Sequence, residues 1–505
     1  MRRILCVAEK NDVAKGVAAI LSKGTMNLLG QNSLLAITSV SGHLTQLDFG
    51  PEMGNWQAIN RAMATLGRLD RHQVDAVDCR SELDLRIGAA FTRLQTLHLR
   101  KKTALFATGE KAVVSYGSCQ FPTLGFVVER YKEIEQFVAE PFWKLAVDVN
   151  KNGTKTEFHW DRGRLFDKDA VDVLFDECRD GKVAVVEDVT CKPKTRWRPV
   201  ALDTVEFEKL AVRKLKLSAK TAMTIAEKLY SQGWISYPRT ETNKYSSDMD
   251  LMPFVQNQLS DAAWGDFASE VYERGPNPRN GNKDQLQANE YRVYELVVRH
   301  FLACLSWDAK GQETVVKLRL GGESFAATGL QVEDLGYMRV YPFDKWSDKV
   351  LTTFNSGEEI RDFLVRIANG TTTPPLLLNE ADLIALMDKF GIGTDATHAE
   401  HIEKLKERRY VGLVEDNRFL PGYLGLALVD AYNQMGIILS FSKTTGYALN
   451  KPLLRADLER KLEAICQGTM TKEEVLQEQR EKYRKIFEET QMRIDLLSST
   501  LTKYL

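Results

Sequence analysis

The sequence predicts a multidomain protein that joins a short α/β unit to larger α+β domains. Three observations support this fold class. The chain has 505 residues, and because a domain usually holds about 100–200 residues, three or four domains are expected. It opens with a strand–helix–strand pattern, which is typical of an α/β sheet. Helical and strand-like stretches then follow in long blocks, which favours separate helical and β-rich domains.

Residues 1–56 are predicted to form the α/β unit. Residues 4–8 are an apolar run between polar residues, which indicates a buried strand. Asn11 or Asp12 can cap a following helix, and Leu34–Ser41 predicts a second strand. The first apolar run is shorter than the roughly 7–15 residues of a signal-peptide core. It is therefore interpreted as part of the folded domain.

The later blocks alternate between helix and strand. Residues 57–140 are predicted to be helical, with Leu83, Ile87, Ala90 and Leu94 at helical spacing. Strand-like alternation then occurs at 142–149, 158–166 and 183–189 in a block 141–200, and at 314–320 and 324–330 in a block 300–370. The block 201–299 between them is predicted to be helical at 204–215 and 219–231, and the block 371–505 is again helical.

Capping residues mark several helix starts in the last block. Asn379 predicts the start of a helix that ends at Gly391, and a second helix follows Thr397. Thr471 and Glu474 have the spacing of a capping box, which predicts the start of a long final helix.

Composition excludes several classes of protein. The chain has 68 Lys and Arg against 69 Asp and Glu, so a nucleic-acid site must be a local basic groove and not a polycationic surface. No apolar run approaches the roughly 18 residues that span a bilayer. The seven cysteines are scattered, without CxxC or zinc-ligand spacing. We therefore expect no zinc, no membrane association, and a reducing compartment such as cytosol or nucleus.

Positive charge is concentrated in the 53 residues Lys192–Lys244. This segment has twelve basic and five acidic residues, an excess of seven positive charges in a neutral chain. Trp197, Tyr230, Trp234 and Tyr237 are interleaved with the charges. A solvated helical face explains the charges alone, whereas a basic groove with stacking aromatic rings is the arrangement that binds single-stranded nucleic acid.

The segment contains the sequence Tyr237-Pro238-Arg239. Pro238 biases Tyr237 toward an extended conformation, so the tyrosine is expected at a strand end or in a turn. Arg239 offers the bidentate fork that suits a phosphate. A tyrosine can act as a covalent nucleophile, but with a pKa of about 10 it needs help to lose its proton. On these residues alone, Tyr237 can be interpreted either as part of a structural turn or as a nucleophile.

Five segments together resemble the type IA DNA topoisomerases, and most closely the eukaryotic topoisomerase III branch. In chain order they are Val7–Asp12, Asp78–Gly88, Ser115–Gly125, Gly233–Thr242 and Gly391–His401. Their order is that of the family, and they extend over most of the chain. The resemblance implies a four-part toroid: a truncated TOPRIM-like α/β unit, a helical gate domain in two parts, a β-rich arch in two parts, and a helical tyrosine domain.

The same resemblance implies the chemistry of the site. Tyr237 would attack a backbone phosphate and form a 5′-phosphotyrosyl link, and Arg239 would stabilise the transition state. Lys10 would position the phosphate, and Glu9 would act as general acid and as a potential Mg²⁺ ligand. Strand passage and religation would follow, relaxing negative supercoils and resolving recombination intermediates. No GxxxxGK[ST] loop occurs in the sequence, in agreement with an ATP-independent reaction.

The resemblance also implies contacts and partners. Single-stranded DNA would be the substrate, with a RecQ-type helicase and an OB-fold accessory protein as partners in the nucleus. The residues expected to contact DNA are Arg80, Gln120, Thr123, Trp234, Thr240, Thr394 and Thr397.

An acidic motif that the resemblance leads us to expect is missing from the sequence. The family's TOPRIM unit carries an Asp-x-Asp-x-Glu cluster that binds Mg²⁺, but here Asn55 is followed within about twenty residues by Asp75–Asp78, with no such cluster between them. The Mg²⁺ site is thus expected to be incomplete. Two alternatives follow: a religation-defective or inactive protein that binds single-stranded DNA, and a helical scaffold that only docks the partner proteins.

Overall fold

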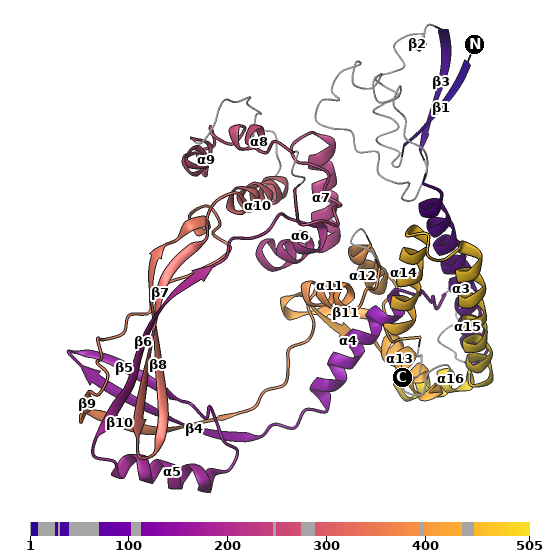
Figure 1. Cartoon of the computed structure of the whole chain (residues 1–505). Coiled ribbons are helices and arrows are strands. Elements are labelled where there is room, and N and C mark those ends of the chain that lie inside the picture. The colour runs from indigo at the N-terminus through magenta and orange to yellow at the C-terminus, as the bar shows by residue number, and fades with distance from the viewer. Residues whose placement is uncertain are drawn as a thin grey trace. The chain divides into compact units, whose positions relative to one another are not determined.

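A computed structural model describes residues 2–8, 26–28, 31–39, 70–102, 113–245, 249–273, 288–393, 397–436 and 449–504. The chain divides into two compact units (Figure 1). Unit 1 contains residues 1–122 and 430–505, and unit 2 contains residues 123–429. The predicted site belongs mainly to unit 2, so the arrangement of that unit determines its geometry.

Unit 1 begins with a small sheet. Strand β1 (Arg2–Ala8) pairs in parallel with β3 (Gln31–Ser39), and β2 (Met26–Leu28) pairs antiparallel with β3. The two predicted strands are therefore present, and their parallel pairing is that of an α/β unit. The helix expected after Asn11 or Asp12 lies outside the described residues.

The rest of unit 1 is a bundle around the long helix α3 (Arg71–Lys102). Helices α14 (Leu453–Cys466), α15 (Lys472–Met492) and α16 (Asp495–Tyr504) pack against it. Leu83 and Ile87 lie on its buried stripe as predicted, but Ala90 and Leu94 are only half-buried. Phe91 and Leu99 continue the stripe instead. Helix α15 starts at the predicted capping box of Thr471 and Glu474.

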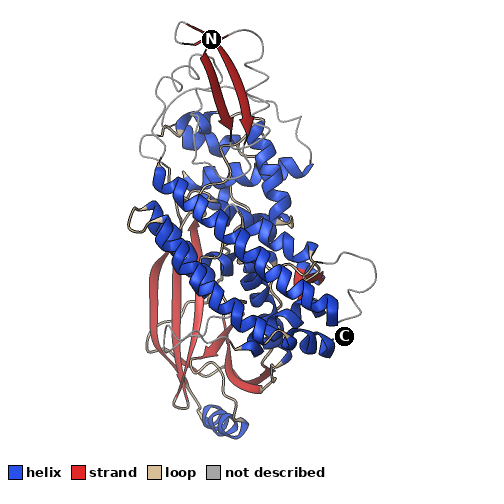
Figure 2. Ribbon diagram, turned by 90° about the vertical axis from the view of Figure 1, so that its right-hand side faces the viewer, coloured by secondary structure: helices blue, strands red, loops and turns tan. Residues whose placement is uncertain are grey.

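Unit 2 contains the β-rich arch, a seven-stranded antiparallel sheet in the order β10-β4-β5-β8-β7-β6-β9 (Figures 1 and 2). Helix α5 (Lys168–Asp180) packs against β4 and β10. The strands are β4 (Pro141–Lys151), β5 (Thr154–Trp160), β6 (Ala184–Arg196), β7 (Ala309–Leu320), β8 (Glu323–Asp334), β9 (Glu359–Ile360) and β10 (Phe363–Thr371).

Two strand predictions in the arch were wrong in extent. The strand expected at 158–166 is β5, which ends at Trp160 because the chain turns at Gly163, a residue with φ of 74°. The strand expected at 183–189 continues as β6 to Arg196. Pro193 is tolerated in β6 because β9 pairs only with Ala184 and Val185, which leaves that edge of the strand open.

The arch leads into a second part of unit 2, here called the helical lobe. Its apolar core includes Phe207, Leu229, Trp264, Leu296 and Tyr337. The core thus includes Tyr337, which the sequence places in the returning arch. The lobe consists of α6 (Thr204–Leu210), the π-helix Ala211–Leu215, α7 (Ala219–Ser231), α8 (Met252–Gln256), α9 (Gly265–Tyr272), α10 (Ala288–Cys304) and the 3₁₀ turn Gly336–Arg339.

Two further helices of unit 2 contact the helical lobe. Helix α11 (Glu380–Lys389) starts at Asn379 in a capping box and packs on α6, and α12 (His398–Glu407) packs on α7. Helix α4 (Gln120–Glu135) joins this group through Phe126, whose ring stacks on Phe390. The hairpin β11 (Val411–Val414) and β12 (Arg418–Pro421), the 3₁₀ turn Glu415–Asn417 and α13 (Tyr423–Met435) follow.

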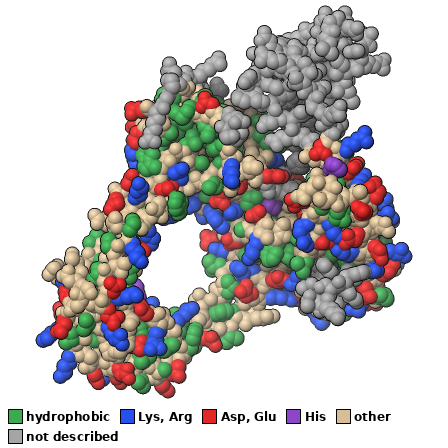
Figure 3. All heavy atoms as spheres, viewed as in Figure 1, with side chains coloured by type: hydrophobic (Ala, Val, Ile, Leu, Met, Phe, Trp, Pro, Cys, Tyr) green, Lys and Arg blue, Asp and Glu red, His purple; other side chains and the backbone are tan. Residues whose placement is uncertain are grey.

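The elements of unit 2 surround an opening. The arch connects α4 to the helical lobe, and the lobe returns to α11 and α12, so the path closes on itself. In the space-filling view, Lys and Arg side chains occur along the edge of this opening together with acidic ones (Figure 3). Within the described ranges, every helix is too short or too polar to cross a membrane.

Candidate active site

The Tyr237 segment follows directly from the end of α7. The helix ends at Ser231, and Gly233 just beyond it has φ of 82°, the left-handed conformation that glycine allows. The N–H of Trp234 donates to the carbonyl of Leu229 at 2.9 Å, which satisfies a carbonyl of the last turn. The chain then continues as an irregular segment through Tyr237. Tyr237 thus lies in an irregular segment that follows the turn at 232–233, and not at the end of a strand.

Tyr237 is half-buried against the helix that precedes it. Its ring meets that of Tyr230 on α7 edge to face, with centroids 5.3 Å apart. Such a contact restrains the ring while part of it stays accessible to solvent.

Arg239 is tied to the same helix. Its Nε donates to Oε1 of Glu227 at 2.7 Å, and the arginine side chain is only 16% exposed. Burial alone would lower the pKa of Arg239, but the hydrogen bond and the charge of Glu227 outweigh it and raise the pKa above its usual value. The guanidinium is therefore a fixed positive charge two residues from the tyrosine.

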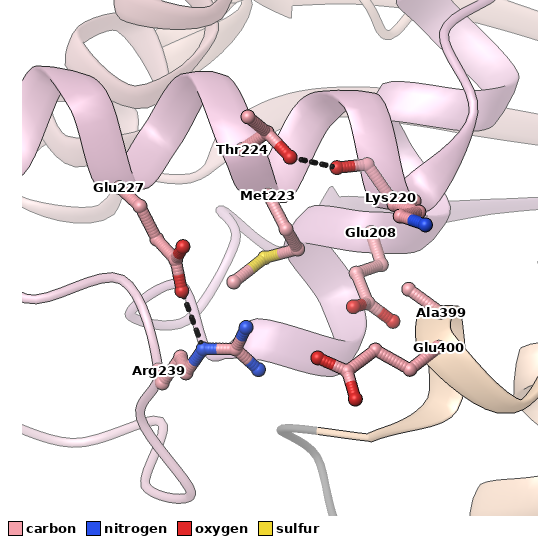
Figure 4. A pocket seen from close by; sticks show the side chains of 8 residues that line it. All are labelled: Glu208, Lys220, Met223, Thr224, Glu227, Arg239, Ala399 and Glu400. Atoms are coloured by element: carbon pink, nitrogen blue, oxygen red, sulfur yellow. Dashed lines mark hydrogen bonds and ion pairs between the residues drawn. The ribbon is translucent and has the colours of Figure 1, made fainter. Parts of the chain in front are cut away.

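A small pocket of about 100 Å³ lies beside Arg239 (Figure 4). The guanidinium points into it, with Glu227 on one side and Glu400 of α12 across from it. The pocket brings together two cationic and three acidic side chains that are far apart in the sequence. Its lining residues are Glu208, Lys220, Met223, Thr224, Glu227, Arg239, Ala399 and Glu400.

The described residues do not form a magnesium site. Within them, no three His, Cys, Asp or Glu side chains lie close enough to hold one metal ion. Glu227 already accepts from Arg239. The sequence-predicted ligand Glu9 and the neighbouring Lys10 lie outside the described residues, so no step is assigned to a metal here.

Comparison with known proteins identifies the family. A sequence model described as DNA topoisomerase matches residues 68–477, most of the chain. The chain belongs to the DNA topoisomerase family. It is 47% identical to DNA topoisomerase 3 of Caenorhabditis elegans, over the whole chain and 80% of that protein. It is 43% and 42% identical to the DNA topoisomerase 3-alpha proteins of Mus musculus and Homo sapiens, again over the whole chain.

The chain is shorter than the relatives over the region they share. It spans 60% of the length of the mouse and human proteins. The alignment with the Caenorhabditis elegans protein extends over 618 positions, although the chain has 505 residues. At least 113 aligned positions of that topoisomerase therefore have no counterpart here.

A solved topoisomerase shares the fold. Topoisomerase I from Thermotoga maritima superposes with a TM-score of 0.66 at 22% identity, over 95% of this chain and 81% of that one. The predictions of a type IA topoisomerase and of its multidomain fold are confirmed.

The predicted DNA contacts near the tyrosine have different environments in this topoisomerase fold. Trp234 packs against the core of the helical lobe, with its ring 5.9 Å from that of Tyr294. The N–H of Thr240 donates to Oγ1 of Thr204. Thr397 precedes α12 as its N-cap residue and is half-buried. Thr394 lies outside the described residues.

The predicted DNA contacts in the other segments belong to helices α3 and α4. Arg80 lies on α3, with its guanidinium 3.7 Å from Asp84 and 3.5 Å from Glu459. Gln120 begins α4 and is half-buried. Thr123 is fully buried. Their contact with DNA stays a prediction.

The positive charge of Lys192–Lys244 is largely balanced by acidic residues from outside that segment. Six of its basic residues form ion pairs with partners far away in the sequence. The segment therefore does not present an unbalanced positive patch in the described part of the chain. The pairs are Lys194–Glu313, Arg196–Asp344, Arg198–Asp308, Arg213–Asp382, Lys220–Glu407 and Lys228–Glu290.

Three residues of the site were missed by sequence reasoning. Glu227, Thr204 and Glu400 meet the Tyr237–Arg239 segment only through the fold. Glu227 had a local signal, because it lies three residues before Tyr230 and therefore on the same face of α7.

Proposed function

We propose that this chain changes DNA topology by cutting one strand with Tyr237, passing a second strand or duplex through the break, and resealing it. The observation that carries the proposal is the environment of the tyrosine. A half-exposed Tyr237 is held against α7, two residues from an arginine whose charge is fixed by Glu227. This arrangement occurs in a chain that belongs to the DNA topoisomerase family.

The proposed reaction exchanges one phosphodiester for another. The Tyr237 hydroxyl oxygen attacks a backbone phosphorus, a phosphorus–tyrosyl bond forms, and the bond to the 3′ oxygen breaks. The tyrosine loses its proton and the 3′ oxygen gains one, so the products are a 5′-phosphotyrosyl link and a 3′-hydroxyl. Bond energy is nearly conserved, so resealing is the reverse reaction and needs no ATP.

Arg239 is the described residue best suited to the reacting phosphate. A guanidinium stabilises the charge that develops on phosphate oxygens in the transition state. Since Glu227 holds the Nε edge, the two terminal nitrogens point into the pocket. By resemblance, Lys10 also positions the phosphate and Glu9 protonates the leaving oxygen.

The junction between the helical lobe and α11–α12 is suited to opening. Arg213 and Lys220 lie 3.8 Å from Asp382 and Glu407, respectively. Exposed ion pairs of this kind contribute about 0–1 kcal/mol each. Their groups can be hydrated when separated, so we propose that the lobe swings away here and opens a gate for the passing strand.

The cellular role follows from the relatives. We propose that Mg²⁺ supports resealing, that a RecQ-type helicase and an OB-fold protein are partners, and that the protein acts in recombination and repair in the nucleus. These assignments rest on the resemblance to the eukaryotic topoisomerase III branch, to which the topoisomerase 3 relatives belong by name.

Covalent trapping tests the proposed chemistry. The chain is incubated with an end-labelled single-stranded oligonucleotide, with and without Mg²⁺, and quenched with detergent. We expect an adduct with the wild type and none with Tyr237→Phe. Tyr230→Phe is the matched control, because it removes a hydroxyl from the ring that packs on Tyr237, and it should still form the adduct.

Two results would count against full activity. An adduct that does not reverse with Mg²⁺ and high salt would favour the religation-defective protein. Salt-sensitive DNA binding without any adduct would refute the proposed cleavage and favour a DNA-binding protein of the same fold.

A further inference from the structure

The Tyr237–Arg239 segment is held by two residues outside the tyrosine motif. We propose that Thr204 and Glu227 are positioning residues, which set the placement of Tyr237 and Arg239 for strand cleavage. Thr204 holds the backbone on both sides of Arg239, and Glu227 holds its guanidinium. The inference rests on the proposed cleavage by Tyr237.

Thr204 forms a clamp on the backbone. Its N–H donates to the carbonyl of Thr240 at 3.1 Å, and its hydroxyl oxygen accepts from the N–H of Thr240 at 2.7 Å. The hydroxyl also lies 3.0 Å from the carbonyl oxygens of Pro238 and Thr240, to which it can donate. The N–H and the hydroxyl of Thr204 therefore bond to the residues immediately before and after Arg239.

The position of Thr204 in the fold explains how it can do this. It is the first residue of α6 and has no solvent exposure. The N–H groups of the first helical turn have no partner within the helix, so this one is available for Thr240. The N-cap Asp203 accepts from Glu206 instead. A buried helix start thus serves as the anchor for a segment that has no regular structure of its own.

Glu227 supplies a second, independent restraint. It lies three residues before Tyr230 on α7, so the two side chains emerge from one face of the helix. Tyr237 and Arg239 are two residues apart, and both contact this helix. The two spacings match: Tyr230 meets Tyr237, while Glu227 meets Arg239 at 2.7 Å.

Together the two restraints fix the relation between the nucleophile and the charged group. Reaction rates depend steeply on such placement, and a displacement of about 1 Å can cost roughly 100-fold in rate. This effect requires no contact between DNA and either residue. Loss of either should therefore slow cleavage at saturating DNA without weakening DNA binding in proportion.

Four variants test the inference. Thr204→Val removes the hydroxyl and keeps the shape, and Thr204→Ser restores the hydroxyl. Glu227→Ala removes the acceptor, and Glu227→Gln keeps an oxygen for Arg239 without the charge. Glu270→Ala is the matched control for Glu227, since Glu270 pairs with Arg339 in the same lobe. Thr502→Val controls for Thr204, since its hydroxyl bonds only within α16.

The rate of adduct formation is measured in a single turnover at saturating oligonucleotide, with DNA affinity and unfolding temperature measured beside it. We expect Thr204→Val and Glu227→Ala to slow the adduct about 10- to 100-fold, with affinity changed less than about threefold. Thr204→Ser and Glu227→Gln should recover most of the rate. Hydrogen exchange at the Thr240 amide should accelerate in Thr204→Val and return to normal in Thr204→Ser.

The outcomes separate the two proposals. If Thr204→Val and Glu227→Ala match the wild-type rate, the positioning inference is wrong and the proposed cleavage stands. The inference is also overturned if the rate falls only in step with the unfolding temperature, or if the conservative variants fail to restore it. If even the wild type forms no adduct, the proposed cleavage fails and the inference fails with it.

Discussion

Arg455 offers the sharpest test of what stabilises unit 1. Its side chain is completely buried between α14 and α3. One terminal nitrogen lies 2.6 Å from Oδ1 of Asp84 and donates to the hydroxyl of Ser118 at 2.8 Å. Its Nε donates to Oε1 of Glu459 at 2.8 Å, and Nη2 forms an ion pair with the same oxygen at 2.7 Å. We predict that Arg455→Met destabilises unit 1 strongly.

The expected size of the effect follows from the exposure of the partners. Removing one member of a buried ion pair costs about 3–5 kcal/mol, because the other charge is left uncompensated. Here the side chains of Asp84 and Glu459 are 36% and 19% exposed and can be hydrated in part. Methionine also fills most of the volume with an apolar chain. We therefore expect the free energy of unfolding to fall by an amount near the lower end of this range, about 3 kcal/mol.

Native-state hydrogen exchange of α3 and α14 measures this loss within unit 1, independently of unit 2. Arg484→Met is the matched control, because Arg484 is 79% exposed and pairs only along its own helix with Glu488. It should change the free energy of unfolding by less than about 0.5 kcal/mol. A loss below about 1 kcal/mol for Arg455→Met would show that the buried network contributes little, and would refute the reasoning.

The same network predicts a pH dependence. Burial alone would raise the pKa of Asp84, but the charge of Arg455 and hydrogen bonds from Ser118 and Arg455 outweigh it, and the pKa lies below its usual value of 3.8. The lowered pKa means that this stabilisation is fully present above pH 3.8 and is lost as the pH falls through the folded-state pKa. Arg455→Met should lack this acid-dependent loss.

Two further predictions concern unit 2. Burial raises the pKa of Glu380, which also accepts from the N–H of Ala219. The ionised form of Glu380 therefore destabilises the fold as the pH rises above about 4.5. Glu380→Gln should match the unfolding temperature of the wild type at pH 4 and exceed it at pH 7.5, and a less stable variant at pH 7.5 would contradict this. A Cβ on Gly425 would lie 2.2 Å from the carbonyl oxygen of Tyr410, so Gly425→Ala should lower the free energy of unfolding in denaturant by about 1–3 kcal/mol. Gly412 has open space around it, so Gly412→Ala should lower it clearly less. Equal losses would contradict the steric argument.

Helix boundaries were predictable where a side chain caps the helix. Asn379 and Thr471 both cap the expected helices, and Thr471 does so in the predicted capping box with Glu474, because these signals depend only on residues within one turn of each other. Helix α5 was not predicted, and part of the preceding turn was assigned to a strand. The turn at Gly163 and the N-cap Asp167 are the local signals that mark this boundary.

The charge pattern shows where a linear sequence is insufficient. The excess of positive charge in Lys192–Lys244 is a correct count, but partners such as Glu313 and Asp382 come from more than a hundred residues away. Whether a basic side chain faces DNA or an acidic neighbour depends on the fold. The same limit applies to Thr204, which meets Thr240 across 36 residues of chain.

The placement of the two positioning residues also bears on the proposed gate. Thr204 and Glu227 belong to α6 and α7, whose apolar residues join the core of the helical lobe. The contacts of this lobe with α11 and α12 include exposed ion pairs, which are weak. A separation at that junction would leave the lobe core, and both restraints on the Tyr237 segment, within one body. The tyrosine and its arginine would thus keep their relative placement while the gate is open, ready for the resealing step.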